Sequence, residues 1–232
     1  MTTTEDSTPE VDVATATVAV LGGTGDQGRG LARRLALAGN TVVLGSRNAE
    51  RAQKAAAELV EAESTGIDVR GLDNAAAAAE GDIVVVAVPW DGHRELLEGL
   101  VEPLAGKIVV DCVNPLGFDK RGPFPLEVPE GSAAQQAEQV LVDSRVTAAF
   151  HHVSARLLLD PEVAEVELDV LVMGEDRAAT DVVRALADRI PGVRGVFGGR
   201  LRNAHQVEAL TANLIAVNRR YKTHAGIRIT GL

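Results

Sequence analysis

The chain has 232 residues, 46% of them hydrophobic and only 3% aromatic, so it can bury a sizeable core built mostly from Ala, Val and Leu. Its 33 acidic residues exceed the 23 Lys and Arg residues, and the net charge of −10 disfavours a nucleic acid as partner. No apolar run approaches the length of a membrane span. Segment 1–16 is polar and Thr-rich without the apolar stretch of a signal peptide, so we expect a disordered tail on a cytoplasmic protein.

Beyond the tail, apolar runs alternate with helical patterns. We expect strands at 18–21, 41–45, 67–72, 83–88, 107–111 and 145–150, with helices after the first strand and at 49–63, 75–79, 92–100 and 132–141. The Pro- and Gly-rich segment 114–131 is expected to be a long functional loop. Strands that alternate with helices in this way predict an α/β fold, a Rossmann-type doubly wound parallel sheet over residues 17–157.

Residues 158–232 are expected to form a smaller C-terminal α+β domain. The pattern predicts strands at 167–173 and 193–197, a helix at 176–189 and a final helix from Arg202. In this last helix an apolar stripe recurs at three- and four-residue steps, which predicts either a core face or a subunit interface; its members are Val207, Leu210, Leu214 and Val217. The basic run 219–222 with His224 is typical of a helix end, and an anionic ligand or a partner subunit is the alternative.

A glycine-rich loop is the most informative motif. Gly23-Thr-Gly-Asp-Gln-Gly28 fits the pattern G-x-G-x-x-G, directly after an apolar β-branched run and directly before a helical pattern. Such a loop turns tightly, lets the backbone approach a pyrophosphate and directs a helix amino terminus at the phosphates. The motif in this context predicts a dinucleotide site.

The end of the second strand indicates which dinucleotide is bound. NAD-binding domains commonly carry an acidic residue there for the ribose 2′-hydroxyl, whereas this chain has Ser46 and Arg47. Asn48 can cap the next helix, whose first turn holds Arg51. Two guanidinium groups and a hydroxyl suit a 2′-phosphate, so we expect NADP.

The segments that follow strands four to six are expected to line the ligand crevice. Trp90, the only tryptophan, either packs beside a flat ring or anchors its own loop. Groups able to take a hydroxyl proton are scarce: no lysine lies between Lys120 and Lys222, and at most one of His151 and His152 is expected to face the crevice. This scarcity favours a reaction in which hydride alone moves between two bound cofactors. Cys112, the only cysteine, is interpreted as a small buried residue, and no metal site is expected.

These segments together resemble the NADPH-dependent reductases of coenzyme F420, over nearly the whole chain after the tail. The resemblance rests on Leu21–Gly30, Gly45–Arg47 with Arg51, Val88–Trp90, Ala149–Ala155 and the C-terminal segment Asn218–Arg228. It implies reversible hydride transfer between NADP(H) and the deazaflavin F420, without a catalytic side chain, in a homodimeric enzyme. The alternatives are another NADP-dependent reductase, acting on an imine or a ferric chelate, and a non-catalytic NADP(H)-sensing module.

The resemblance also implies which residues bind the two cofactors. The glycine loop would hold the pyrophosphate, and the cationic cluster after the second strand would hold the 2′-phosphate. The segments after strands four to six would flank the nicotinamide and the deazaflavin. The complete set of expected cofactor-binding residues is Gly23, Thr24, Gly25, Asp26, Gln27, Gly28, Ser46, Arg47, Arg51, Val88, Pro89, Trp90, Asn114, His151, Val153, Ser154 and Ala155.

Overall fold

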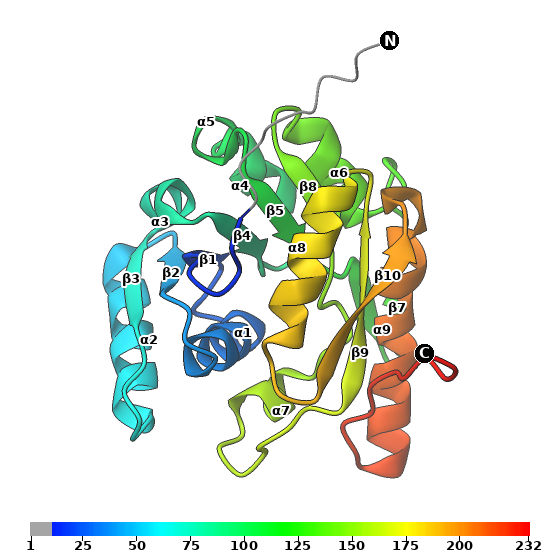
Figure 1. Cartoon of the computed structure of the whole chain (residues 1–232). Helices are drawn as coiled ribbons and strands as arrows, with labels where there is room; N and C mark the ends of the chain where they lie inside the picture. The colour runs from blue at the N-terminus through cyan, green and yellow to red at the C-terminus, as the bar shows by residue number, and fades with distance from the viewer. Residues whose placement is uncertain (1–10) are drawn as a thin grey trace.

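Short strands rich in β-branched residues form the centre of the molecule. The computed structural model describes residues 11–232, and its main sheet has the strand order β10-β9-β8-β5-β4-β1-β2-β3 (Figure 1). All residues of the four central strands β1, β2, β4 and β5 are buried, as expected of parallel strands covered on both faces. The strands are β1 Val18–Leu21, β2 Val42–Ser46, β3 Val69–Asp73, β4 Ile83–Val86, β5 Ile108–Asp111, β8 Arg145–Ala148, β9 Leu168–Gly174 and β10 Val193–Gly199.

Helices cover both faces of this sheet. Alternate residues of β1 point to opposite sides, so Val18 and Val20 pack in one core cluster, and Ala19 and Leu21 in the other. The first cluster includes residues of α1 Asp26–Leu37, α2 Ala49–Ala62, α7 Ala155–Leu159 and α8 Arg177–Asp188. The second includes residues of α3 Asn74–Glu80, α4 His93–Glu98, α5 Val101–Leu104, α6 Ala133–Val140, η1 Leu201–Asn203 and α9 Ala204–Tyr221. The expected Rossmann-type α/β fold is confirmed.

Side-chain caps begin several of these helices. Asn48 accepts a hydrogen bond from the N–H of Arg51 at the start of α2, as its sequence position predicts. Asp73 accepts a hydrogen bond from the N–H of Ala76 at the start of α3. Because each cap lies at the carboxyl end of a strand, it also marks where the chain turns from sheet to helix.

The C-terminal residues extend the same sheet. β9 pairs antiparallel with β8 at Thr147 and Ala148, and β10 pairs parallel with β9. The sheet is therefore mostly parallel, and β9 and β10 run in the opposite direction to the other six strands. Strands of both predicted domains, 17–157 and 158–232, share this one sheet. The division into two domains stays a prediction.

The segment 114–131 is more ordered than the sequence suggested. It contains a hairpin of β6 Leu116–Asp119 and β7 Gly122–Pro125, so the prediction of a loop over the whole segment was wrong. Asp119 Oδ1 accepts hydrogen bonds from the N–H groups of Arg121 and Gly122 and closes the turn. The strand β7 packs against α9, which lies beside it in Figure 1.

The apolar stripe of α9 is buried at one end and exposed at the other. Val207 is buried in the core, whereas Val217 is 36% exposed. The first half of α9 is thus a core helix that contacts α6, and the second half leaves the core. The core alternative is confirmed for the first half only.

Two side chains tie distant segments to α1 and its C-terminal loop. The buried Arg34 donates hydrogen bonds to the carbonyl oxygens of Leu157, Leu158 and Val163, at 2.7–2.9 Å, around the end of α7. Asn40 donates to the carbonyl oxygens of Val13 and Ala16.

Asn40 thereby orders part of the expected tail. Residues 11–16 form a turn in which the N–H of Ala16 donates to the carbonyl oxygen of Asp12, instead of being disordered, while residues 1–10 lie outside the described part of the chain. Across residues 11–232, no helix combines the length and apolar character needed to cross a membrane.

Candidate functional site

The glycine loop joins β1 to α1, and the structural reason for a glycine differs from one position of the loop to the next. A Cβ on Gly23 would lie 2.7 Å from Leu44 Cδ2, and one on Gly28 would lie 2.8 Å from the Cα of Gly23. These two glycines are therefore required by the packing of the loop itself. A Cβ on Gly25 would meet nothing closer than 3.6 Å, and its φ of −82° suits any residue.

The exposed Gly25 is the N-cap of α1, where a glycine has no side chain to cover the first turn. Neither packing nor backbone conformation requires a glycine here; glycine is a favoured N-cap residue, and at this position it also leaves free space for a ligand. Backbone N–H groups and the positive end of the helix dipole suit a phosphate. The expected pyrophosphate residues Thr24, Asp26 and Gln27 lie on this same turn.

The side chain of Gln27 has a second role in the structure. Its Nε2 donates to the carbonyl oxygen of Phe150 at 3.3 Å. This bond links the glycine loop to the segment after β8, which is on the other side of β4 and β5 in the sheet order. The two halves of the expected crevice therefore meet at Gln27.

The cationic cluster lies at the carboxyl end of β2. Ser46 is the last residue of β2 and is 8% exposed, while Arg47 and Arg51 are exposed. Ser46 Oγ accepts from the N–H of Asn48 at 3.3 Å, which keeps the hydroxyl at the turn. Within residues 11–232 neither guanidinium forms a salt bridge, so both are available to a phosphate.

Asn74 is a residue of this end of the site that the sequence reasoning missed. It is the first residue of α3, and a Cβ on Gly45 would lie 2.9 Å from its Oδ1. This oxygen is buried and has no hydrogen-bond partner among the described residues. Since buried acceptors are normally paired, Asn74 is a candidate ligand contact beside the cationic cluster.

The expected nicotinamide side consists of residues after β4. Val88 and Trp90 are half-buried and Pro89 is exposed. A Cβ on Gly22, whose φ is +74°, would lie 2.7 Å from Val88 Cγ1, so this segment packs directly on the glycine loop. Trp90 packs on the buried ring of His93, with ring centroids 5.5 Å apart. Anchoring of its own loop is thus part of the role of Trp90.

Asn114, after β5, joins two further segments. Its Nδ2 donates to the carbonyl oxygen of His151 at 2.8 Å, and its Oδ1 accepts from Thr211 Oγ1 at 3.3 Å. Thr211 Oγ1 also lies 3.0 Å from the carbonyl oxygen of His151. Thr211 of α9 was missed by the sequence reasoning, although a hydroxyl within an apolar helix pattern was the available signal. The three residues attach α9 to the carboxyl edge of the sheet.

His151 and His152 are both buried, at 3% and 4% exposure, and their four ring nitrogens have no partner among the described residues. Burial lowers the pKa of each to about 4, so both rings are neutral at physiological pH. The carboxylate that raises the pKa is Asp111 of β5 for His151 and Asp169 of β9 for His152. Since β5 and β9 are the two neighbours of β8 in the sheet, the two rings are influenced by carboxylates on opposite edges of β8.

A strained residue directs this histidine pair. Phe150 has a φ of 63°, a left-handed conformation that is uncommon for a bulky residue, and it is 1% exposed. The chain leaves β8 at Ala148 and turns here, so the histidines do not continue the strand. The expected strand end at residue 150 was therefore wrong, because β8 ends two residues earlier, at Ala148.

The rest of this segment leads into α7. Val153 is buried, Ser154 is the N-cap residue, and Ala155 begins the helix. A Cβ on Gly30 of α1 would lie 2.7 Å from Leu158 Cβ, so α7 packs directly on α1. This contact and the Gln27 bond hold the segment after β8 next to the glycine loop.

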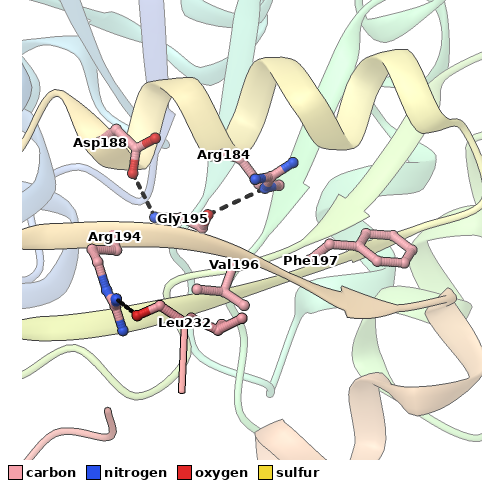
Figure 2. A pocket seen from close by; sticks show the side chains of 7 residues that line it. All are labelled: Arg184, Asp188, Arg194, Gly195, Val196, Phe197 and Leu232. Carbon is pink, nitrogen blue, oxygen red and sulfur yellow. Dashed lines mark hydrogen bonds between the residues drawn. The ribbon is translucent and has the colours of Figure 1, made fainter. Parts of the chain in front are cut away.

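Two other features lie outside this arrangement. Cys112 is buried, its Sγ lies 3.1 Å from the carbonyl oxygen of Val86, and burial strongly raises its pKa, which disfavours a thiolate nucleophile. Figure 2 shows a pocket between α8, the edge strand β10 and the C-terminal Leu232. In this pocket Arg184 and Asp188 bind the backbone of Gly195. Because β9, β8, β5 and β4 separate β10 from β1, this pocket is distinct from the glycine-loop site.

The chain is similar to known proteins over most of its length. Residues 17–115 match the family described as NADP oxidoreductase, coenzyme F420-dependent. F420-dependent NADP reductases of Methanothermobacter marburgensis and Methanocaldococcus jannaschii are each 42% identical to the chain, over 93% of this chain and 98% of each relative. A crystal structure of an Arthrobacter sp. FB24 protein proposed to be an F420-dependent NADP reductase superposes with a TM-score of 0.78, at 27% identity, over 93% of this chain and 99% of that one. The chain belongs to the family of F420-dependent NADP reductases.

Proposed function

We propose that the protein is an NADP-dependent oxidoreductase that transfers hydride reversibly between NADPH and F420, directly from ring to ring, at the carboxyl edge of the sheet. The observation that carries the proposal is the 42% identity to F420-dependent NADP reductases over 93% of the chain. Similarity of this extent includes the segment after β8 and α9 as well as the glycine loop. A shared dinucleotide-binding half alone would not support a particular acceptor.

The first half of the site fits NADP(H). Gly25 leaves room at the start of α1, where the first-turn N–H groups and the helix dipole favour a pyrophosphate. Ser46, Arg47 and Arg51 supply a hydroxyl and two guanidinium groups at the end of β2, where a 2′-phosphate is expected. Guanidinium groups pair with phosphate oxygens in a bidentate way, so this cluster is the basis of the preference for NADP over NAD.

The second half fits a flat, polar ring system. His151 and His152 belong to the segment after β8, their four ring nitrogens have no partner among the described residues, and burial keeps both rings neutral. A neutral imidazole can donate one hydrogen bond and accept another. His151 and the neighbouring residues Val153, Ser154 and Ala155 are thus suited to the polar edge of a deazaflavin, and Trp90 and Val88 to the apolar face of the nicotinamide.

The chain contributes positioning to this reaction. F420 accepts a hydride at a ring carbon, and a hydride transfer requires the donor and acceptor carbons to be held about 3–3.5 Å apart. The hydrogen bonds from Asn114 and Thr211 to the carbonyl oxygen of His151 fix the segment that would orient the acceptor. The Gln27 bond to Phe150 fixes that segment relative to the glycine loop. No side chain in this scheme forms a covalent bond to a substrate.

The proposal is tested by mixing the protein with NADPH and F420. We expect loss of the visible absorbance of the deazaflavin, and its return when NADP is added in excess to the reduced coenzyme. Parallel assays with NADH, an imine and a ferric chelate separate this activity from other reductases. Absence of bleaching by folded protein that binds NADPH would contradict the proposal and favour a sensing module.

We further propose that the protein acts in the cytoplasm as a homodimer. The single cysteine is buried and unpaired, which suits a reducing compartment. Exposed apolar side chains lie on α9 and on the hairpin next to it, which supports burial of this surface between two copies; they are Phe118, Phe124, Val217 and Tyr221. Light scattering of the purified protein measures the oligomeric state, and a monomer at micromolar concentration would contradict the dimer.

A further inference from the structure

A buried polar cluster lies behind the nicotinamide side of the site. It consists of His93, Asp111, Gln136 and Glu208, contributed by α4, β5, α6 and α9, and all four residues are at most 6% exposed. His93 Nε2 lies 2.6 Å from Asp111 Oδ2, and His93 Nδ1 lies 2.9 Å from Gln136 Oε1. Neither the proposed hydride transfer nor the core packing explains four polar side chains here.

The hydrogen-bond partners of the two ring nitrogens of His93 determine whether the ring is neutral or charged. Gln136 Nε2 donates to the carboxylate of Glu130 at 3.3 Å, so its Oε1 faces His93 as an acceptor. The Asp111 carboxylate also accepts. Because both ring nitrogens of His93 face acceptors, both must donate, and the ring is an imidazolium. Burial lowers the pKa of His93, but the charge and hydrogen bond of Asp111 and the bond to Gln136 outweigh burial and raise it.

The imidazolium connects two loops of the crevice. His93 begins α4 three residues after Trp90, and the N–H of His93 donates to the carbonyl oxygen of Trp90 at 3.0 Å. Asp111 ends β5, and its Oδ1 accepts from the N–H of Val113 at 3.0 Å. The pair His93–Asp111 therefore joins the segments after β4 and β5, which are neighbouring strands.

The ring of Trp90 packs on this charge. Its centroid is 5.5 Å from that of His93, with an angle of 30° between the ring planes. A cation at this distance from an indole is attracted by the negative face of the ring. Trp90 thus has a fixed partner on its inner side.

Other charged groups around the cluster are few. Glu208 of α9 accepts hydrogen bonds from the N–H groups of Ala133 and Ala134, at 3.1 and 3.2 Å, and once it is ionised its charge raises the pKa of His93. Glu130 binds Gln136 and is paired with Arg94 on the exposed side of α4. The charge of Asp111 also acts on His151, which follows β8, the strand next to β5.

We propose that His93 is a positioning residue, which as an imidazolium held by Asp111 and Gln136 fixes Trp90 and the loop after β5 at the separation required by a bound nicotinamide. This role rests on the proposed assignment of Val88 and Trp90 to the nicotinamide side. His93 does not touch the reacting atoms. It acts through Trp90 on one side and through Asp111 and Val113 on the other.

Trp90 provides a direct readout, because it is the only tryptophan in the chain. An imidazolium next to an indole quenches its fluorescence, so Trp90 emission is expected to rise as pH increases and His93 loses its proton. The substitution His93→Gln should abolish this transition. Gln136→Met, which removes the acceptor at Nδ1, should move it to lower pH. His224→Gln, at an exposed histidine of the C-terminal segment, should leave it unchanged.

Steady-state kinetics complete the test. In His93→Gln we expect kcat with NADPH to fall about tenfold or more while KM for F420 stays within about twofold, since a misplaced nicotinamide lowers the chemical step. Constant Trp90 emission in the unsubstituted protein, an unchanged transition in either cluster variant, or an unchanged kcat in folded His93→Gln would overturn the proposal. The fluorescence titration needs no F420, so it separates failure of this proposal from failure of the F420 assignment. If His93→Gln does not fold, the titration of Gln136→Met tests the proposal instead.

Discussion

Replacing Glu208 by Gln is expected to remove a loss of stability that the protein suffers as pH rises. Glu208 is 2% exposed, and burial together with the charge of Asp111 raises its pKa from 4.5 to about 8, although two backbone N–H groups and His93 act in the opposite direction. Between these pH values the folded protein keeps a proton that the unfolded chain has already released. Stability therefore falls as pH increases through this range.

The size of the effect follows from the shift. Each unit of pKa difference corresponds to about 1.4 kcal/mol, so a shift from 4.5 to about 8 lowers the free energy of unfolding by up to roughly 5 kcal/mol between these pH values. Gln cannot ionise and lacks this contribution. It keeps one acceptor for the N–H groups of Ala133 and Ala134, and loss of the other bond costs about 1 kcal/mol.

Urea unfolding at pH 5, 6.5 and 8 measures the prediction. We expect Glu208→Gln to be slightly less stable than the unsubstituted protein at pH 5 and clearly more stable at pH 8. Glu58→Gln, at an exposed carboxylate of α2, shows the effect of removing one surface charge. An identical difference between Glu208→Gln and the unsubstituted protein at all three pH values would refute the reasoning, because Glu208 would then titrate alike in both states.

Further predictions concern the cofactor cluster and the buried arginine of α1. Replacement of both Arg47 and Arg51 by Ala should raise KM for NADPH by about 100-fold and that for NADH by less than threefold, since only NADPH carries the 2′-phosphate; Lys54→Ala on α2 is the control, and equal losses for both cofactors would contradict the assignment. Arg34→Lys should lower the free energy of unfolding by about 2–4 kcal/mol, because a lysine cannot reach all the carbonyl oxygens around the end of α7. Urea unfolding checks this, with the half-exposed Arg29→Lys as control, and a loss below about 0.5 kcal/mol would show that the clamp is unimportant.

Local patterns were sufficient to predict the elements and residues of the proposed dinucleotide half of the site. The apolar β-branched runs, the glycine spacing and the cap residue Asn48 each act over a few residues, and the first two strands lie within one residue of where these patterns predict them, whereas β4 and β8 end two residues earlier than expected. The cationic cluster was also predictable, because Ser46, Arg47 and Arg51 lie within six positions of one another. In each case the interaction joins neighbours in sequence.

The second half of the site depends on contacts between distant residues. Asn114, His151 and Thr211 meet only because α9 packs across the carboxyl edge of the sheet, 97 positions from Asn114 in the chain. His93 and Glu208 showed no local pattern, since a histidine and a glutamate on helices are ordinary surface residues until the packing buries them. The hairpin β6-β7 was missed because Pro and Gly mark a turn without indicating that the flanking residues pair.

The sequence by itself determined a Rossmann-type sheet and the resemblance to F420-dependent reductases and predicted an NADP-type phosphate site, because glycine spacing, strand patterns and charge at strand ends are properties of short segments. Only the tertiary structure decided that β9 and β10 continue the same sheet, that both histidines after β8 are buried and unpaired, and that His93 is held as a cation behind Trp90. Burial and charge pairing result from the packing of remote elements, and they set which ring nitrogens keep protons and which remain free for a ligand.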